Sequence, residues 1–117
     1  MVFGFGRADL EQVSAAEAIS LSAGSARLID VREPWEFEAG HAPQATNVPM
    51  SQLDARLDEL SKDDTLLIIC HSGQRSQSVT GRLDHAGFSA VNVIGGMLDW
   101  VAAGGDIVAS DDRTPHV

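Results

Sequence analysis

The sequence contains a single cysteine, and this scarcity limits the thiol chemistry that is possible. Cys70 cannot form an internal disulfide, and one thiolate cannot build a metal cluster. The four histidines show no spacing typical of metal ligands. We therefore expect no metal and no other cofactor, and a lone thiol fits a reducing, cytoplasmic compartment.

Positive charge is also scarce. Eight Lys and Arg residues stand against 17 Asp and Glu residues, and the net charge is −9. Because nucleic-acid phosphates require a basic surface, this balance argues against nucleic acid as a partner. A basic protein partner stays open, although an acidic surface also serves solubility.

Long apolar runs are absent. The longest unbroken aliphatic run has four residues, 66–69, whereas a helix needs roughly 20 to cross a bilayer. Residues 1–10 lack the basic start and apolar centre of a secretory signal. We expect no membrane segment, a cytoplasmic location, and a monomer or weak homodimer.

What is present is the composition of one globular domain. The chain has 117 residues, of which 44% are hydrophobic and 21% charged, so it can bury one core. We expect a single domain over residues 1–117, with its core at about 13–105. Residues 1–7 are expected to form a mobile arm and residues 107–117 a free tail.

Short apolar runs alternate with helical patterns along the chain. This alternation predicts an α/β fold whose parallel strands are covered by helices on both faces. Strands are expected at 27–31, 47–49, 66–69 and 90–94. Helices are expected at about 14–21, from Pro34, at 51–60 with Ser51 as its cap, from Ser76 to about 86, and at 97–103.

Three aromatic or imidazole side chains follow Pro34. Trp35 and Phe37 are expected to pack against the domain, and His41 is expected to be a hydrogen-bonded structural residue. None of them is expected to take part in chemistry.

The stretch 65–87 concentrates the features that predict chemistry. Cys70 directly follows a wholly apolar strand, and a helix begins a few residues later. A turn this tight can aim successive backbone N–H groups inward, because Gly73 tolerates positive φ. The helix N-terminus and the nearby Arg75 favour the thiolate form of the cysteine. The pattern predicts a nucleophilic thiol in an anion cradle, the alternative being a buried core cysteine.

A second group of polar residues ends the strand at 27–31. If this strand is parallel to 66–69, its carboxyl end reaches the same edge as Cys70. Asp30 can then pair with Arg75 or accept from the loop amides, while Arg32 faces the substrate or pairs with Glu33 or Glu36. Arg75 in turn either contacts the substrate or holds the loop.

Three motifs carry a resemblance to a known family. The loop from Cys70 to Ser76 resembles the C-x-x-G-x-R-S active-site loop of rhodanese-like sulfurtransferase domains. The upstream segment 28–49 and the downstream residues Gly95, Gly96, Trp100 and Gly104 resemble the other signatures of that family. The resemblance covers roughly residues 13–105. It implies a five-stranded parallel sheet with Cys70 at the base of a shallow pocket at its carboxyl edge.

The resemblance also implies an activity, thiosulfate sulfurtransferase. Cys70 would take a sulfur atom from a small anionic donor such as thiosulfate and pass it, as a persulfide, to a thiol or protein acceptor. The anion-binding loop would comprise His71, Ser72, Gly73, Gln74, Arg75 and Ser76, supported by Asp30 and Arg32.

Two other classes of function stay open. A Cys-dependent phosphatase or an arsenate reductase also places Cys and Arg around a loop before a helix. The phosphatase loop resembles C-x5-R, which is one residue longer than the segment from Cys70 to Arg75. A non-catalytic interaction module is the third reading, although inert rhodanese-like modules usually lack the cysteine.

Overall fold

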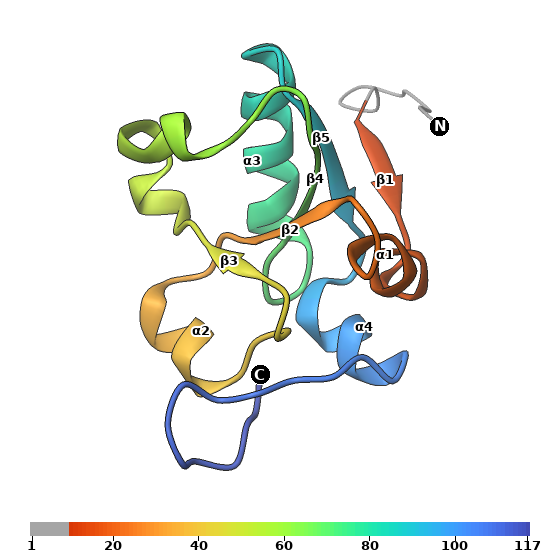
Figure 1. Cartoon of the computed structure of the whole chain (residues 1–117), viewed down its shortest axis with the longest axis vertical. Helices are drawn as coiled ribbons and strands as arrows, with labels where there is room; N and C mark the ends of the chain where they lie inside the picture. The colour runs from red at the N-terminus through yellow and green to blue at the C-terminus, as the bar shows by residue number, and fades with distance from the viewer. Residues whose placement is uncertain (1–9) are drawn as a thin grey trace.

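The computed structural model describes residues 10–117, so the arm expected at residues 1–7 lies outside the described part. Its centre is a five-stranded sheet of order β1-β5-β4-β2-β3, in which every neighbouring pair is parallel (Figure 1). This confirms the predicted fold class. The strands are β1 (Glu11–Val13), β2 (Arg27–Asp30), β3 (Thr46–Asn47), β4 (Thr65–Ile69) and β5 (Ser89–Val93).

The strand β4 forms the middle of the sheet because its side chains suit burial on both faces. After Thr65 its residues are fully buried, as the unbroken apolar run predicts. β2 pairs with it in register, with Asp30 opposite Ile69. The carboxyl ends of these two strands therefore lie side by side, and Cys70 emerges at this edge.

Helices cover both faces of the sheet. One face packs against α3 (Gln74–His85) through a cluster that includes Ile68, Val79 and Leu83. The other packs against α1 (Ala15–Ser22) and α4 (Gly96–Ala102) through Ala18, Ile69 and Trp100. α2 (Pro34–Ala39) lies at the carboxyl edge of the sheet rather than on a face (Figure 1). No helix within residues 10–117 has both the length and the apolarity to cross a bilayer.

Local sequence signals mark the ends of several of these helices. Ser14 and Glu17 form the expected reciprocal capping box before α1. Pro34 occupies the first turn of α2, where its missing N–H costs no helical hydrogen bond. Gly87 has the positive φ, 95°, expected just after α3.

The prediction of one continuous helix at 51–60 is wrong. The segment consists of two short 3-10 helices, η2 (Met50–Gln52) and η3 (Asp54–Glu59), and Arg56 has non-helical backbone angles. Ser51 does not cap them but donates to the Glu33 carboxylate. The expected apolar face nevertheless forms, since Leu53 and Leu60 are buried. Packing of the leucines, not helix propensity, defines this segment.

Two further expectations are wrong. Trp35 does not pack against the domain, because 71% of it is exposed. Residues 107–117 do not form a free tail: Val108 pairs with His41 in an antiparallel bridge, and the chain passes beneath α2 (Figure 1). The strand β1 has no counterpart among the strands read from the residues, since its three residues are too few for a pattern.

Candidate active site

Cys70 occupies the turn that joins β4 to α3. β4 ends at Ile69, Cys70 is the next residue, and α3 begins at Gln74. Gly73 has a φ of 103°, a left-handed conformation in which a side chain is strained. A Cβ at Gly73 would also lie 3.0 Å from the backbone nitrogen of Gly95. Glycine at position 73 therefore lets the loop close tightly against the turn before α4.

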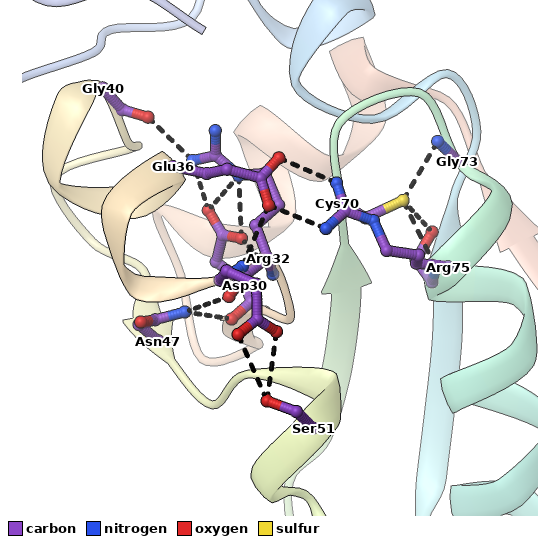
Figure 2. A network of polar contacts seen from close by, with 11 residues as sticks. Asp30, Arg32, Glu36, Gly40, Asn47, Ser51, Cys70, Gly73 and Arg75 are labelled. Carbon is purple, nitrogen blue, oxygen red and sulfur yellow. Dashed lines mark hydrogen bonds and ion pairs between the residues drawn. The ribbon is translucent and has the colours of Figure 1, made fainter.

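The sulfur of Cys70 lies inside this loop. The backbone N–H groups of Gly73 and Ser76 donate to Sγ at 3.1 and 3.3 Å (Figure 2). The thiol also hydrogen-bonds the Ser76 hydroxyl at 3.3 Å. Backbone N–H groups that converge on one atom are donors of the kind that can bind a negatively charged sulfur group.

The start of α4 holds the loop in this orientation. The carbonyl of Cys70 accepts from the N–H of Met97 at 2.8 Å, and that of His71 accepts from Leu98 at 3.1 Å. Gly96 permits this approach, since a Cβ there would lie 2.4 Å from the Cys70 oxygen. Both carbonyl oxygens therefore have hydrogen-bond partners in α4. The sequence places the glycine pair Gly95-Gly96 at a sharp bend, but its role as a brace for the loop emerges only here.

Cys70 is more deeply covered than the expected shallow pocket implies. Only 1% of the residue is exposed, and it contributes to an apolar cluster on the α3 face of the sheet. A cavity of about 310 Å³ lies beside the loop and is bounded by two of its residues, His71 and Arg75, but not by Cys70 itself. The sulfur is therefore not open to this cavity in the present structure.

Arg75 binds Glu36 of α2, a partner that the sequence does not suggest for it. Its two terminal nitrogens donate to the two carboxylate oxygens at 2.7 and 2.9 Å (Figure 2). This bidentate contact lowers the pKa of Glu36 to about 2, and it raises the pKa of Arg75. The pairing links the Cys70 loop to α2 across the cavity and leaves the Arg75 charge largely neutralised.

The expected pairing of Asp30 with Arg75 is wrong, because Arg75 binds Glu36 instead. Asp30 binds Arg32, whose Nε and Nη2 donate to both of its carboxylate oxygens at 2.7 to 3.1 Å. Arg32 Nη2 also donates to the carbonyl of Gly40 at 2.7 Å (Figure 2). Asn47 donates to the carbonyls of Asp30 and Arg32. Arg32 pairs with neither Glu33 nor Glu36, but it does border the cavity beside the loop. The group of Asp30, Arg32 and Asn47 fixes the connection between β2 and α2.

The other residues of the loop have different surroundings. His71 is half-buried and lines the cavity, whereas Ser72 and Gln74 are exposed. His41 bonds the carbonyl of Phe37 through Nδ1, as expected of a structural histidine. Within residues 10–117 no three His, Cys, Asp or Glu side chains cluster as a metal site requires.

Two parts of the cavity wall come from residues that the sequence did not mark as functional. Trp35 and Glu36 project from α2, and His116 and Val117 come from the C-terminal end of the chain. In the sequence, nothing about the six-residue helix that directly follows Arg32 and Glu33 indicates that it faces the loop. The tail lacks any pattern that predicts its docking, so only the tertiary fold brings it to the cavity.

Comparison with protein families gives one clear match. A family model described as "Rhodanese-like domain" matches residues 14–103, a range that contains both the loop and α4.

Several curated proteins are similar over most of the domain. The putative sulfur carrier protein YrkF of Bacillus subtilis (strain 168) is 37% identical over 77% of this chain, which spans 54% of that protein's length. The putative sulfurtransferase YtwF of the same organism is 45% identical, with 62% of this chain and 71% of that protein covered. Thiosulfate sulfurtransferase 16, chloroplastic, of Arabidopsis thaliana is 37% identical, with coverage of 79% and 88%.

A solved structure shows the same architecture. The crystal structure of a rhodanese-related protein from Thermoplasma volcanium superposes with a TM-score of 0.78 at 30% sequence identity. The match covers 84% of this chain and 97% of that one. The fold described above is therefore similar to that protein's along nearly the whole of its length.

Proposed function

The chain belongs to the rhodanese-like domain family, and from this premise we propose that it is a sulfurtransferase which carries sulfur as a persulfide on Cys70. Relatives named sulfurtransferase and sulfur carrier support the general class. The relative named thiosulfate sulfurtransferase supports thiosulfate as the donor. Since the chain corresponds to only part of some relatives, the proposal concerns this domain alone.

The hydrogen bonds around the Cys70 sulfur are the observation that supports this proposal best. Two backbone N–H groups converge on Sγ, and the neighbouring carbonyls are bound to α4. Cys70 is buried like a core cysteine, but a cysteine that serves packing alone needs no such donors. The same donors can hold the terminal sulfur of a persulfide, which carries a full negative charge near neutral pH.

The proposed reaction has two steps. In the first, the Cys70 thiolate attacks the outer sulfur of thiosulfate; a new S–S bond forms, the S–S bond of thiosulfate breaks, and sulfite leaves with the electron pair. In the second, an acceptor thiolate attacks the terminal sulfur of the persulfide. The acceptor leaves as a persulfide and the Cys70 thiolate is restored, so no oxidant or reductant is consumed.

The lone cysteine favours a carrier over a redox enzyme. After sulfur is loaded, no second cysteine in the chain can attack the adduct and close a disulfide. The sulfur must therefore pass to an external thiol or to another protein. A thiol that has to stay reduced between cycles fits a cytoplasmic location.

Mass spectrometry of the intact protein tests the proposal directly. After incubation with thiosulfate, the wild-type chain should gain the mass of one sulfur atom, and cyanide should remove it. Cys70→Ser keeps the shape of the side chain and should gain no mass. Ser78→Ala, an exposed position on α3, serves as the matched control and should load like the wild type.

The competing enzyme class gives a different result in a parallel assay. A Cys-dependent phosphatase would hydrolyse an aryl phosphate through Cys70 and gain no sulfur from thiosulfate. The loop from Cys70 to Arg75 is one residue short of the phosphatase pattern, so we expect no hydrolysis. Aryl phosphate turnover that is lost in Cys70→Ser, without sulfur loading, would refute the sulfurtransferase proposal.

A further inference from the structure

The C-terminal segment, residues 106–117, is bound to the domain although it lies beyond the family match at 14–103. Val108 and His41 exchange two backbone hydrogen bonds of 2.8 and 2.9 Å. Ser110 then donates to the carbonyl of Glu38, and His116 donates to that of Ala39. The segment thus follows the C-terminal end of α2, and we call it the strap.

Two glycines allow the strap to lie against the domain. A Cβ at Gly40 would come within 2.1 Å of the His116 carbonyl oxygen, which is far closer than atoms can approach. A Cβ at Gly105 would lie 2.3 Å from Nε1 of Trp100, and that nitrogen donates to the carbonyl of Asp106. The strap is therefore closely packed at its beginning and near its end, not loosely laid on the surface.

The strap completes the cavity beside Cys70. The domain supplies one side through His71 and Arg75 of the loop and another through Trp35 and Glu36 of α2, and the strap supplies His116 and Val117. Val117 also packs against the apolar cluster on the α4 side of the sheet. The strap thus supplies two of the eight residues that line this cavity, and the matched domain supplies the other six.

We propose that the strap is the outer wall of the approach to Cys70 and selects donors and acceptors by size. This inference rests on the proposed function for its biological meaning. The cavity, about 310 Å³, is at the small end of ligand pockets, which span roughly 300–1,000 Å³. It has room for a small anion such as thiosulfate or for one thiol side chain, but the wall opposes a bulky acceptor. Specificity toward small sulfur compounds thus comes from a segment outside the common domain.

The wall can be displaced without changing the chemistry of the loop. Gly40→Ala places a methyl group where the His116 carbonyl now lies and should push the end of the strap away from α2. A chain that ends at Asp112 removes His116 and Val117 altogether. Gly24→Ala is the matched control, because a Cβ there meets only the Leu21 carbonyl at an ordinary 3.5 Å.

Alkylation of Cys70 measures access without requiring sulfur transfer. Rates with iodoacetamide, a small reagent, and with N-(1-pyrenyl)maleimide, a bulky one, are compared by mass spectrometry in proteins shown to be folded by circular dichroism. We expect the ratio of the maleimide rate to the iodoacetamide rate to rise about fivefold in Gly40→Ala and in the shortened chain. Gly24→Ala should keep the wild-type ratio.

A ratio that stays at the wild-type value in both strap variants would overturn the proposal. If the shortened chain does not fold, Gly40→Ala alone decides. Sulfur loading from thiosulfate is measured on the same samples. If neither the wild type nor any variant loads sulfur, the proposed function is refuted. The alkylation ratio would still test whether the strap limits access to Cys70.

Discussion

Two arginine–carboxylate pairs lie near the carboxyl edge of the sheet, and they differ in their access to water. Asp30 and Arg32 are buried, with 0% and 1% of their side chains exposed. Glu36 and Arg75 lie at the mouth of the cavity, with 16% and 36% exposed. Both pairs have short, multiple hydrogen bonds, so geometry alone does not distinguish them.

The difference in burial gives the two pairs different functions. Arg32 borders the cavity, but only 1% of its side chain is exposed, so water could replace a lost carboxylate partner only poorly. The Asp30–Arg32 pair therefore acts as part of the framework. The Glu36–Arg75 pair can exchange its carboxylate for another anion, because 36% of the Arg75 side chain is exposed and Arg75 lines the cavity. We therefore assign the first pair to structure and expect the second to respond to substrate.

Asp30→Asn breaks the buried pair and is expected to have the largest effect. The Arg32 charge would be left buried beside a neutral amide, and the free energy of unfolding should fall by about 3–5 kcal/mol. Urea denaturation followed by circular dichroism measures it. Asp54→Asn, which breaks an exposed pair with Arg82, is the control and should cost no more than about 0.5 kcal/mol. Equal losses in the two variants would mean that burial does not distinguish the pairs.

Replacing both partners sharpens the same comparison. In Asp30→Asn/Arg32→Met no charge remains to be solvated, and the free energy of unfolding should recover by about 1–3 kcal/mol relative to Asp30→Asn. The recovery should be incomplete, since Arg32 also binds the carbonyl of Gly40. Urea denaturation is again the measurement, and a double variant less stable than Asp30→Asn would contradict the unpaired-charge explanation.

Glu36→Gln breaks the exposed pair and should have a smaller effect on stability, about 1 kcal/mol. The substitution should lower stability but improve the binding of an anionic substrate, because the Arg75 charge is no longer neutralised. With a dianionic donor such as thiosulfate we expect KM to fall about threefold at low salt, and less at high salt. Steady-state kinetics at two salt concentrations tests this, with Glu59→Gln, remote from the cavity, as the control. A higher KM would show that Glu36 mainly orders the loop.

The contribution of Glu36 to stability should depend on pH. The pKa of Glu36 is lowered by Arg75 to about 2, from an ordinary value of 4.5. The stabilisation is therefore fully present above pH 4.5 and is lost as the pH falls toward 2. Because Arg75 is partly exposed, we expect the effect to stay below about 1 kcal/mol. Wild type and Glu36→Gln should differ less in urea midpoint at about pH 3 than at neutral pH, and a constant difference would contradict this origin.

The sequence predicts much of this fold because its strongest signals are local. An apolar run with no polar interruption can only be buried, and this identifies β4 and places Cys70 at its end. The capping box of Ser14 and Glu17 lies within one turn and depends on no distant residue. Gly73 and Gly87 occupy positive-φ positions that neighbouring residues demand. These features follow from residues a few positions apart.

The candidate site could be predicted only in part. Its loop and its nucleophile come from one continuous segment, and the resemblance of this segment to a known motif identifies them. The ion-pair partners of the charged residues could not be predicted in this way, because several carboxylates lie close enough to the same edge of the sheet to pair with either arginine. Glu36 and Arg75 are 39 residues apart, and only the packing of α2 beside the loop decides that they meet.

The amino-acid sequence by itself determined the parallel α/β architecture and the position of a lone thiol between strand and helix, because burial and backbone preference act over short distances. The tertiary structure decided how Asp30, Arg32, Glu36 and Arg75 are paired. It also decided that Cys70 is covered and that residues 106–117 close the cavity. These outcomes depend on which surfaces come together, and such contacts are set by the packing of the whole domain rather than by any one segment.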